Sequence, residues 1–173
     1  GIYQEKNTNT LLTAVMQLYN NQIIRNIDSV AKGFSNVCEA TGLMGRWQQI
    51  QENPIVICDT GHNEAGWKDL SLQIKNQKCL NLRIVFGMVD DKDIEAVMAL
   101  LPENAHYYWT QPSTKRAFAV AKIAEVGERY GLKGKAFTNV EEAYKQALSE
   151  SDEDDFIFVG GSSYVVADLL SKF

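Results

Sequence analysis

The pattern of hydrophobic and polar positions changes near residue 45. In the first part of the chain, hydrophobic residues recur at i, i+3, i+4 and i+7, which is the spacing of an amphipathic helix. Two such patterns are present, one made of Leu12, Val15, Met16 and Tyr19, the other of Ile27, Val30, Ala31 and Phe34. After a break at Thr41–Gly45, short apolar runs alternate with helical patterns. The change predicts a helical segment, residues 1–44, followed by an α/β segment, residues 45–173.

Six runs in the second segment are expected to form strands: Trp47–Gln51, Ile55–Asp59, Leu82–Gly87, His106–Gln111, Lys135–Phe137 and Phe156–Gly160. Apolar strands that alternate with amphipathic helices are typical of a parallel sheet covered on both faces, and right-handed crossovers then give a Rossmann-like open sheet. Only a short turn around Asn53-Pro54 joins the first strand to the second, so the first should run antiparallel at an edge. The predicted fold class is α/β: a mostly parallel six-stranded sheet with one antiparallel edge strand and helices on both faces, preceded by a short helical segment.

Two local features concern the later helices and strands. Thr138 and Glu141 have the spacing of a capping box, which predicts a helix start. The acidic stretch Ser149–Asp155 is expected to be a solvated loop in front of a buried strand, with a cation site as the alternative.

Charge and composition narrow the classes of partner. The net charge is −5 and the 17 Lys and Arg are scattered, whereas binding to a nucleic acid or to a membrane surface requires a basic face. No apolar run approaches the roughly 20 residues of a membrane span. The three cysteines lie far apart without a CxxC pair, so we expect neither disulfides nor a metal site, and a cytoplasmic location fits best. Because the chain opens without Met, we expect a fragment of a longer protein.

Ligands of open α/β sheets bind at the carboxyl ends of the strands, so the residues that follow each strand are the most informative. Asp59, His62 and Asn63 follow the second strand. An Asp at this position can accept two hydrogen bonds from a ribose diol, and His62 would lie at a helix amino terminus, which attracts anions. The structural alternative is that Asn63 caps the helix and His62 is solvated.

The third strand is followed by Gly87–Asp93, with the sequence GMVDDKD. Gly87 permits a tight turn, and Lys92 could bring a positive charge to a carboxylate or a phosphate. The alternative is that Asp91 or Asp93 caps the next helix and that Lys92 is merely exposed.

Two further strand ends carry polar residues. Lys115 and Arg116 follow the fourth strand, where they either reach the crevice or lie on the surface. Gly160–Tyr164, with the sequence GGSSY, follows the last strand, and Ser162 there offers a hydroxyl beside free N–H groups, which suits a carboxylate or a phosphate. The alternative is a glycine turn with a Ser cap. No GKS or GKT follows, so this is not a Walker A loop.

Two other enzyme classes are not favoured. A hydrolase triad of Asp59, His62 and Ser162 lacks the GxSxG elbow, and His62 is too close in sequence to Asp59 for the required geometry. A phospho-accepting receiver domain would need an acidic pair at the end of its first strand, and no such pair is evident there. Each strand-end signal is weak alone, and their common position at one edge of the sheet is what favours a functional site.

In this order, the strand-end motifs resemble the carboxyl-terminal region of folylpolyglutamate synthases, including the bifunctional dihydrofolate synthases, within the Mur ligase superfamily. The matching motifs are GRWQ (Gly45–Gln48), Pro54, DTGHNE (Asp59–Glu64), GMVDDKD (Gly87–Asp93), KRA (Lys115–Ala117) and GGSSY (Gly160–Tyr164). Tyr3–Leu12 resembles the stretch that closes the family's central domain. The resemblance implies that residues 1–44 are the helical tail of a central ATP-binding domain and that residues 45–173 are the carboxyl-terminal domain.

The sequence departs from the family pattern at three positions. Gly61 replaces Ala, Glu64 replaces Pro, and Lys115 stands where the family has Pro. None of these departures removes a charged or hydrogen-bonding group of the implied site.

The resemblance implies an ATP-dependent ligase that joins L-glutamate to folate or dihydropteroate through an acyl phosphate. It places Asn7 near the adenine, Arg46 near the phosphates and Asp59 on the ribose. His62, Lys92 and Ser162 would face the glutamate and the reacting phosphoryl group, with Lys92 and His62 in catalytic roles.

The family's phosphate loop, its magnesium ligands and most of its folate pocket lie in the preceding domain, and no GxxxxGK[ST] occurs in this chain. The resemblance therefore implies ATP and Mg²⁺ as cofactors, the protein's own amino-terminal ATPase domain as partner, and an inactive, weakly ATP-binding chain when alone. Two alternatives stay open: a cell-wall Mur-type amino-acid ligase, which GRWQ disfavours, and a non-catalytic nucleotide-binding α/β module.

Overall fold

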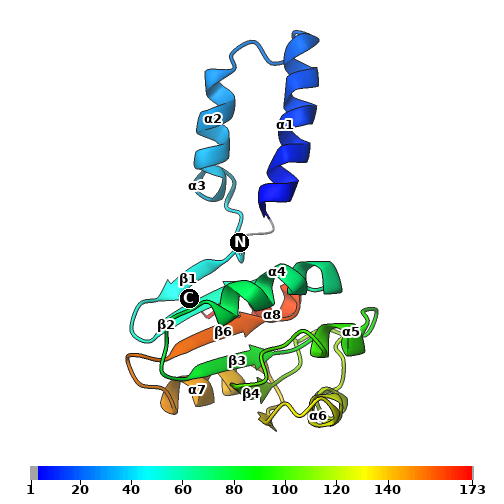
Figure 1. Cartoon of the computed structure of the whole chain (residues 1–173), viewed down its shortest axis with the longest axis vertical. Coiled ribbons are helices and arrows are strands. Elements are labelled where there is room, and N and C mark those ends of the chain that lie inside the picture. Colours follow the sequence, from blue (N-terminus) through cyan, green and yellow to red (C-terminus); the bar gives the residue numbers. More distant parts are fainter. Residues whose placement is uncertain (1–3, 173) are drawn as a thin grey trace. The chain divides into compact units, whose positions relative to one another are not determined.

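The computed structural model describes residues 4–172, which fall into two compact units, Gly1–Met44 and Gly45–Phe173 (Figure 1). The first unit consists of α1 (Gln4–Asn20), α2 (Asp28–Ser35) and α3 (Val37–Thr41). The predicted apolar stripes lie on α1 and α2, yet none of the side chains 7–44 is buried. Tyr3, at the start of the segment that resembles the family, lies outside the described residues.

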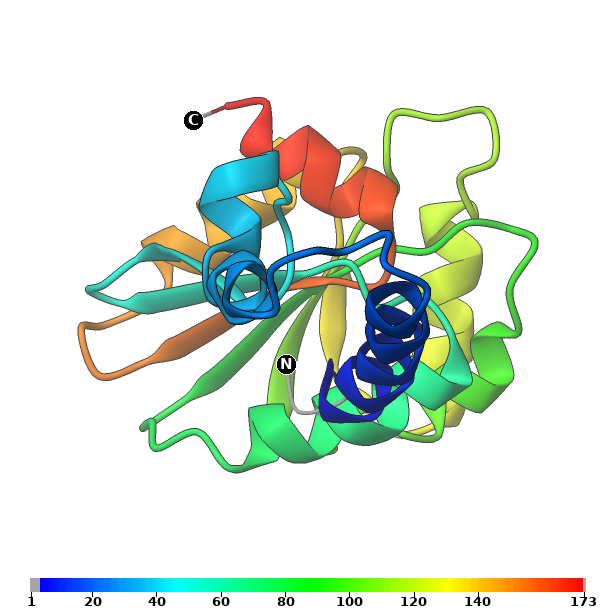
Figure 2. The ribbon, with the colours of Figure 1, turned by 90° about the horizontal axis from the view of Figure 1, so that it is seen from above.

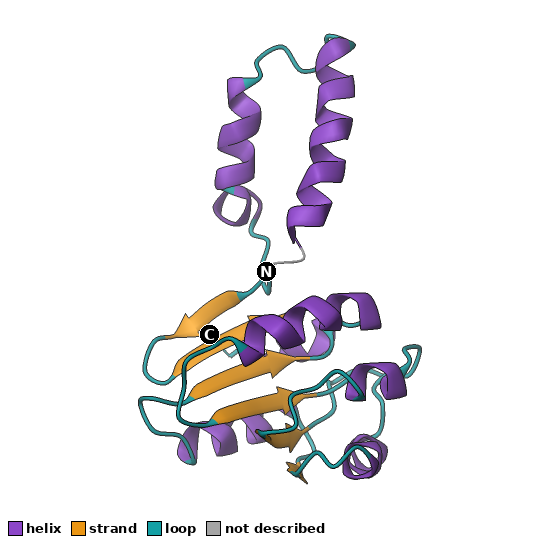
Figure 3. Ribbon diagram, viewed as in Figure 1, coloured by secondary structure: helices purple, strands orange, loops and turns teal. Residues whose placement is uncertain are grey.

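The second unit contains one sheet, with the strand order β1-β2-β6-β3-β4-β5 (Figure 3). Only β1 and β2 pair antiparallel, and the other neighbours are parallel. The bounds are β1 Gln48–Gln51, β2 Ile55–Asp59, β3 Leu82–Phe86, β4 Ala105–Trp109, β5 Gly134–Ala136 and β6 Phe156–Gly160. The predicted fold class is confirmed, and the strand ends differ from the predicted ones by at most two residues.

The order of the strands explains where a ligand can bind. Helix α4 (Glu64–Lys75) connects β2 to β3, α5 (Ile94–Met98) connects β3 to β4, and α6 (Val120–Arg129) connects β4 to β5, so the chain crosses the sheet in one direction. Helix α7 (Val140–Ser149) then leads back to β6, which lies between β2 and β3. Because crossovers are right-handed, this reversal places α7 on the opposite face. Figure 2 shows α7 and α8 (Ser163–Leu170) on one side of the sheet and α4, α5 and α6 on the other. The loops that leave β2, β3 and β6 thus diverge and open a crevice at the carboxyl ends of these strands.

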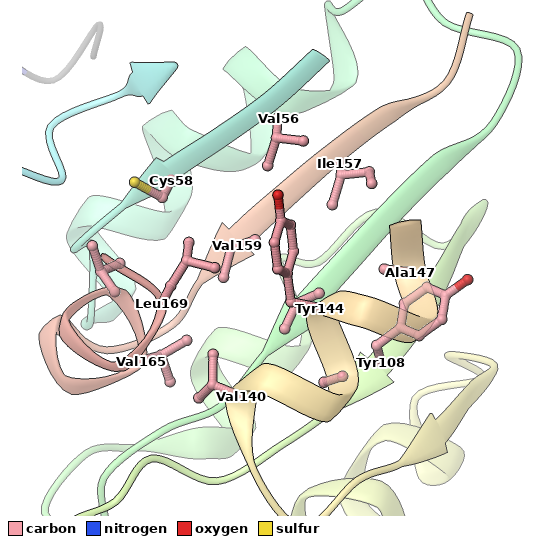
Figure 4. Packing of buried hydrophobic residues seen from close by; sticks show 13 residues of the cluster. Val56, Cys58, Tyr108, Val140, Tyr144, Ala147, Ile157, Val159, Val165 and Leu169 are labelled. Carbon is pink, nitrogen blue, oxygen red and sulfur yellow. The ribbon is translucent and has the colours of Figure 1, made fainter. Parts of the chain in front are cut away.

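Both faces of the sheet are packed, and successive residues on one strand serve opposite faces. On β2, Val56 and Cys58 belong to the apolar cluster under α7 and α8, together with Tyr144 and Leu169 (Figure 4). On the other face, the Trp67 ring of α4 packs edge-on against Phe86 and Phe158, with centroids 5.5 and 5.7 Å apart. This double cover fixes the strand ends that carry the polar residues.

The capping box predicted at Thr138 and Glu141 is wrong by one residue. Asn139 caps α7, because its side-chain oxygen accepts a hydrogen bond from Glu142 N at 2.9 Å. Thr138 Oγ1 instead donates to Glu142 Oε2 at 2.8 Å. Asn is at least as good a cap as Thr, so the neighbouring Asn takes the position.

The acidic stretch before β6 is a loop whose last residue is buried. Asp152 and Asp154 are exposed, but Asp155 is buried and accepts a hydrogen bond from Arg83 Nε at 3.0 Å. Asn81 Nδ2 donates to the other oxygen of Asp155 at 2.8 Å. The stretch therefore ends in an anchor that ties the loop to the sheet.

None of the helices within residues 4–172 has the length and apolar character required to cross a membrane. The cysteines Cys38, Cys58 and Cys79 are free thiols.

Candidate functional site

Asp59, the last residue of β2, is fully buried and holds two backbone groups. Its Oδ2 accepts a hydrogen bond from Trp47 N at 2.7 Å, and its Oδ1 accepts one from Gly61 N at 2.8 Å. Trp47 has a φ of 50°, a conformation that L-residues rarely adopt, so the hydrogen bond stabilises a strained turn. Arg46, predicted near the phosphates of ATP, lies exposed on this turn. The Asp59 side chain thus supports the turn that carries Arg46.

Gly45 begins this turn with a φ of 72°, which favours glycine. Its N–H donates to Gln48 Oε1 at 2.8 Å, and its carbonyl accepts from Thr60 N at 2.8 Å. A Cβ at Gly45 would lie 2.7 Å from Thr60 Cγ2 and 2.8 Å from Val166 Cγ1. The Gly and the Gln of the GRWQ motif are therefore required by the backbone geometry around Arg46.

His62 lies between β2 and α4 and is exposed. Its Nδ1 is 3.0 Å from the carbonyl oxygen of Thr60. Because a carbonyl oxygen can only accept, this contact assigns the hydrogen to Nδ1, and a neutral ring then presents the lone pair of Nε2. Asn63 caps α4 by accepting from Gly66 N at 2.9 Å, as the structural alternative predicted.

The loops after β3 and β4 are joined to each other. Val89 and Ala117 form an isolated antiparallel bridge, Asp90 N donates to Arg116 O at 2.9 Å, and Phe118 N donates to Met88 O at 2.9 Å. These bonds place Arg116 across from the GMVDDKD loop.

Asp91 pairs with two cations at this junction. Arg116 Nη2 forms an ion pair with Asp91 Oδ2, and Lys92 Nζ lies 3.3 Å from the same oxygen. Desolvation acts to raise the pKa of Asp91, but the hydrogen bond from Lys92 and the charge of Arg116 outweigh it and hold the pKa below its ordinary value. Asp93, not Asp91, caps α5, through a hydrogen bond from Ala96 N at 3.1 Å.

The turn after β6 brings its backbone very close to the end of β3. Gly161 has a φ of 97°, and a Cβ there would lie 2.5 Å from Gly87 O. Ser162, 1% exposed, caps α8 because its Oγ accepts from Tyr164 N at 3.1 Å. The amino terminus of α8 thereby faces the loop after β3.

One cavity of about 230 Å³ joins these strand ends, and it is lined by His62, Val89, Asp91, Lys92, Arg116, Ser162, Ser163 and Tyr164. The structure therefore brings together three predicted site residues, His62, Lys92 and Ser162. The cavity also contains Arg116, for which the KRA motif leaves both a functional and a surface position open. It contains Asp91 as well, which the sequence suggests only as a helix cap. Asp59 and Arg46 do not line this cavity, and Asn7 is an exposed residue of α1 in the first unit.

A larger cavity of about 770 Å³ lies along α6 and the start of β5, where Glu125, Glu128, Lys133 and Trp109 are among its lining residues. It contains none of the predicted site residues. We therefore place the candidate site in the smaller cavity.

Residues 45–163 match the protein family described as "Mur ligase, glutamate ligase domain". The chain belongs to this family. The expected resemblance is thus confirmed, and the match covers every strand of the sheet and all the residues that line the cavity except Tyr164.

Relatives with names that match the resemblance are found among curated proteins. A protein of Halobacterium salinarum named probable bifunctional folylpolyglutamate synthase/dihydropteroate synthase is 29% identical over 146 residues, which cover 84% of this chain and 17% of that protein. The dihydrofolate synthase/folylpolyglutamate synthase of Escherichia coli is 31% identical over 129 residues, which cover 74% of this chain and 30% of that enzyme. This Mur ligase domain therefore spans less than a third of the length of either relative.

Solved structures show the same fold. Escherichia coli FolC in complex with DHPP and ADP superposes with a TM-score of 0.69 at 29% identity, covering 75% of this chain and 31% of that one. A bifunctional folylpolyglutamate synthase/dihydrofolate synthase with Mn, AMPPNP and L-glutamate bound superposes with a TM-score of 0.67 at 30% identity, covering 75% and 31%.

Proposed function

We propose that this chain is the carboxyl-terminal part of an ATP-dependent ligase that joins L-glutamate to folate. The activity is that of a folylpolyglutamate synthase, with dihydrofolate synthase activity left open. The observation that carries the proposal is the convergence of His62, Lys92, Arg116 and Ser162 on one cavity at the carboxyl ends of parallel strands. Membership in the glutamate ligase family and the names of the relatives support it.

The cavity has the chemistry that an incoming glutamate requires. Lys92 and Arg116 provide two cations for carboxylates, and Arg116 can bind a carboxylate through two parallel hydrogen bonds. The amino terminus of α8 adds N–H groups that favour an anion. We assign to Ser162 the role of fixing this terminus, since its hydroxyl already caps the helix.

The reaction implied by the family forms an acyl phosphate on the substrate carboxylate, which the amine of glutamate then attacks. The glutamate ammonium first loses a proton to solvent, and the neutral amine then attacks. The new amide bond replaces the bond to phosphate, phosphate leaves, and the nitrogen loses one further proton. We assign the acceptance of that proton to Nε2 of His62, because its Nδ1 hydrogen is held by the Thr60 carbonyl. Lys92 would neutralise charge that develops beside the transferred group.

The nucleotide contacts are a separate part of the proposal. Arg46 is exposed on a turn held at both ends, which suits a phosphate contact. Asp59 is buried and accepts a hydrogen bond from Trp47 N. Its role in the proposed ATP site is therefore to hold the turn that carries Arg46, and a direct contact with a ribose would require this turn to open. Asn7 is proposed to lie near the adenine.

The remaining parts of the site are assigned to sequence outside this chain. Within residues 4–172 the structure contains no group of three or more His, Cys, Asp or Glu that could hold a metal ion. We propose that the magnesium ligands, the phosphate loop and most of the folate pocket belong to an amino-terminal ATPase domain, of which residues 1–44 are the last helices. The free thiols of the three cysteines support a cytoplasmic location.

Substrate-dependent ATP turnover by the full-length protein tests this proposal. The protein is incubated with ATP, Mg²⁺ and labelled L-glutamate, with dihydropteroate, a reduced folate or a cell-wall precursor as the acceptor. ADP formation and glutamate incorporation that require both substrates are expected. Incorporation only into a cell-wall precursor would move the protein to another branch of the family, and nucleotide binding without turnover would favour a non-catalytic module.

A further inference from the structure

The carboxylate of Asp91 is the one anion among the residues that line the cavity, and it is bonded to both cations there. Its Oδ2 pairs with Arg116 Nη2 and accepts from Lys92 Nζ at 3.3 Å. The side chains of Asp91, Lys92 and Arg116 are 41%, 32% and 52% exposed, so a ligand in the cavity can reach all three.

Backbone geometry alone does not fix the two cations. The bridge between Val89 and Ala117 sets the separation of their loops, but the side chains of Lys92 and Arg116 carry several rotatable bonds beyond it. Two like charges on one wall also repel each other. A carboxylate between them removes the repulsion and selects the rotamers in which both cations point to the same place.

The charges match those of an amino acid with two carboxylates. Lys92 and Arg116 bring two positive charges and Asp91 brings one negative charge, which leaves one positive charge in the cavity. L-glutamate with a protonated amine carries two carboxylates and one ammonium, and thus one net negative charge.

We propose that Asp91 is a positioning residue for glutamate: it holds Lys92 and Arg116 as a pair, so that both cations meet the carboxylates of the incoming amino acid. This inference rests on the proposed function and adds to it a residue that the strand-end motifs had offered only as a helix cap.

Kinetics of the full-length protein test the role. Asp91→Asn keeps the size of the side chain and removes its charge, so the KM for L-glutamate is expected to rise about tenfold, the loss of one charge-assisted hydrogen bond. The KM for ATP and the kcat should each change by less than about twofold. Asp91→Glu should restore most of the glutamate affinity.

A double-mutant cycle shows whether Asp91 acts through Arg116. If it does, Asp91→Asn combined with Arg116→Gln has no larger effect on the KM for glutamate than Arg116→Gln alone. Glu95→Gln is the matched control, because Glu95 forms an ion pair with Arg129 and the two side chains are 44% and 56% exposed, respectively. Neither residue lines the cavity. This control should leave all three kinetic constants unchanged.

An unchanged or lower KM for glutamate in Asp91→Asn would overturn the inference. It would also be overturned if the KM of the double variant rose by the product of the two single increases, because the two residues would then act independently. If the wild-type protein does not use glutamate at all, the proposed function fails instead. The pairing is then measured directly in this chain by NMR. The Arg116 Nε–H signal should shift in Asp91→Asn and stay in place in Glu95→Gln, and a signal unmoved by Asp91→Asn would rule out the pairing.

Discussion

The carboxylate of Asp59 and the backbone N–H of Trp47 form a hydrogen bond of 2.7 Å that ties the end of β2 to the turn in front of β1. Asp59 was predicted to meet a ribose, and the structure shows that its two oxygens already hold Trp47 and Gly61. Since Arg46 lies on the same turn, one buried carboxylate determines where an exposed cation is presented.

Asp59→Asn should lower the free energy of unfolding of this chain by about 2 kcal/mol, because an amide nitrogen would face a backbone N–H donor that it cannot accept from. Urea unfolding followed by tryptophan fluorescence measures the change. Asp154→Asn, an exposed change in the loop before β6, is the control and should stay close to wild type. In the full-length protein, Asp59→Asn should also raise the KM for ATP more than that for folate. Equal stability of Asp59→Asn and wild type would contradict the role of the turn.

Gly161 is expected to tolerate no side chain. Gly161→Ala should destabilise the chain by about 3 kcal/mol or more, because it combines a left-handed φ with a backbone clash. The φ is 97°, and the new Cβ would lie 2.5 Å from Gly87 O. Gly131→Ala is the matched control, since Gly131 has a φ of 71° with open space around it and should lose only about 1 kcal/mol. If urea unfolding gives the two variants the same loss, the close approach of the two strand ends is not what requires glycine.

Glu150 is expected to stabilise the fold against acid. Hydrogen bonds from Lys135, Tyr108 and Gln146 lower the pKa of Glu150 from 4.5 to about 2. A carboxyl with a depressed folded pKa contributes stability that is complete above its unfolded pKa and is lost as the pH falls through its folded pKa. The stability that Glu150 contributes is therefore lost between about pH 4.5, its ordinary pKa, and about pH 2, its pKa in the folded chain. Glu150→Gln should flatten the pH dependence of the unfolding free energy in this window.

Glu153→Gln serves as the control for that titration, because Glu153 is exposed in the adjoining loop. Its pH profile should follow that of the wild type. A Glu150→Gln profile that is parallel to wild type between pH 4.5 and 2 would show that the contacts of Glu150 do not form in solution.

Much of the fold could be predicted from the sequence because apolar strands and amphipathic helices obey short periods. The antiparallel edge strand followed from the short turn at Asn53-Pro54 alone. His62, Lys92 and Ser162 could be grouped without a structure, since the carboxyl ends of parallel strands share one edge.

The remaining features depend on contacts between distant residues. The pairing of Asp91 with Arg116 requires the bridge between Val89 and Ala117, which no local pattern signals. The burial of Asp155 requires Arg83, which lies 72 positions earlier in a strand that reads as apolar. For Asp59, the sequence cannot distinguish a carboxylate that awaits a ligand from one that is bonded to backbone N–H groups.

The most direct test of the central claim, that the cavity at the strand ends receives glutamate, is the steady-state kinetics of Lys92→Ala in the full-length protein. The KM for L-glutamate is expected to rise by about tenfold or more while the KM for ATP stays nearly constant. Lys145→Ala, which removes an exposed lysine paired with Glu141 on α7, should change neither. A defect of Lys92→Ala confined to ATP would contradict the assignment of this cavity to glutamate.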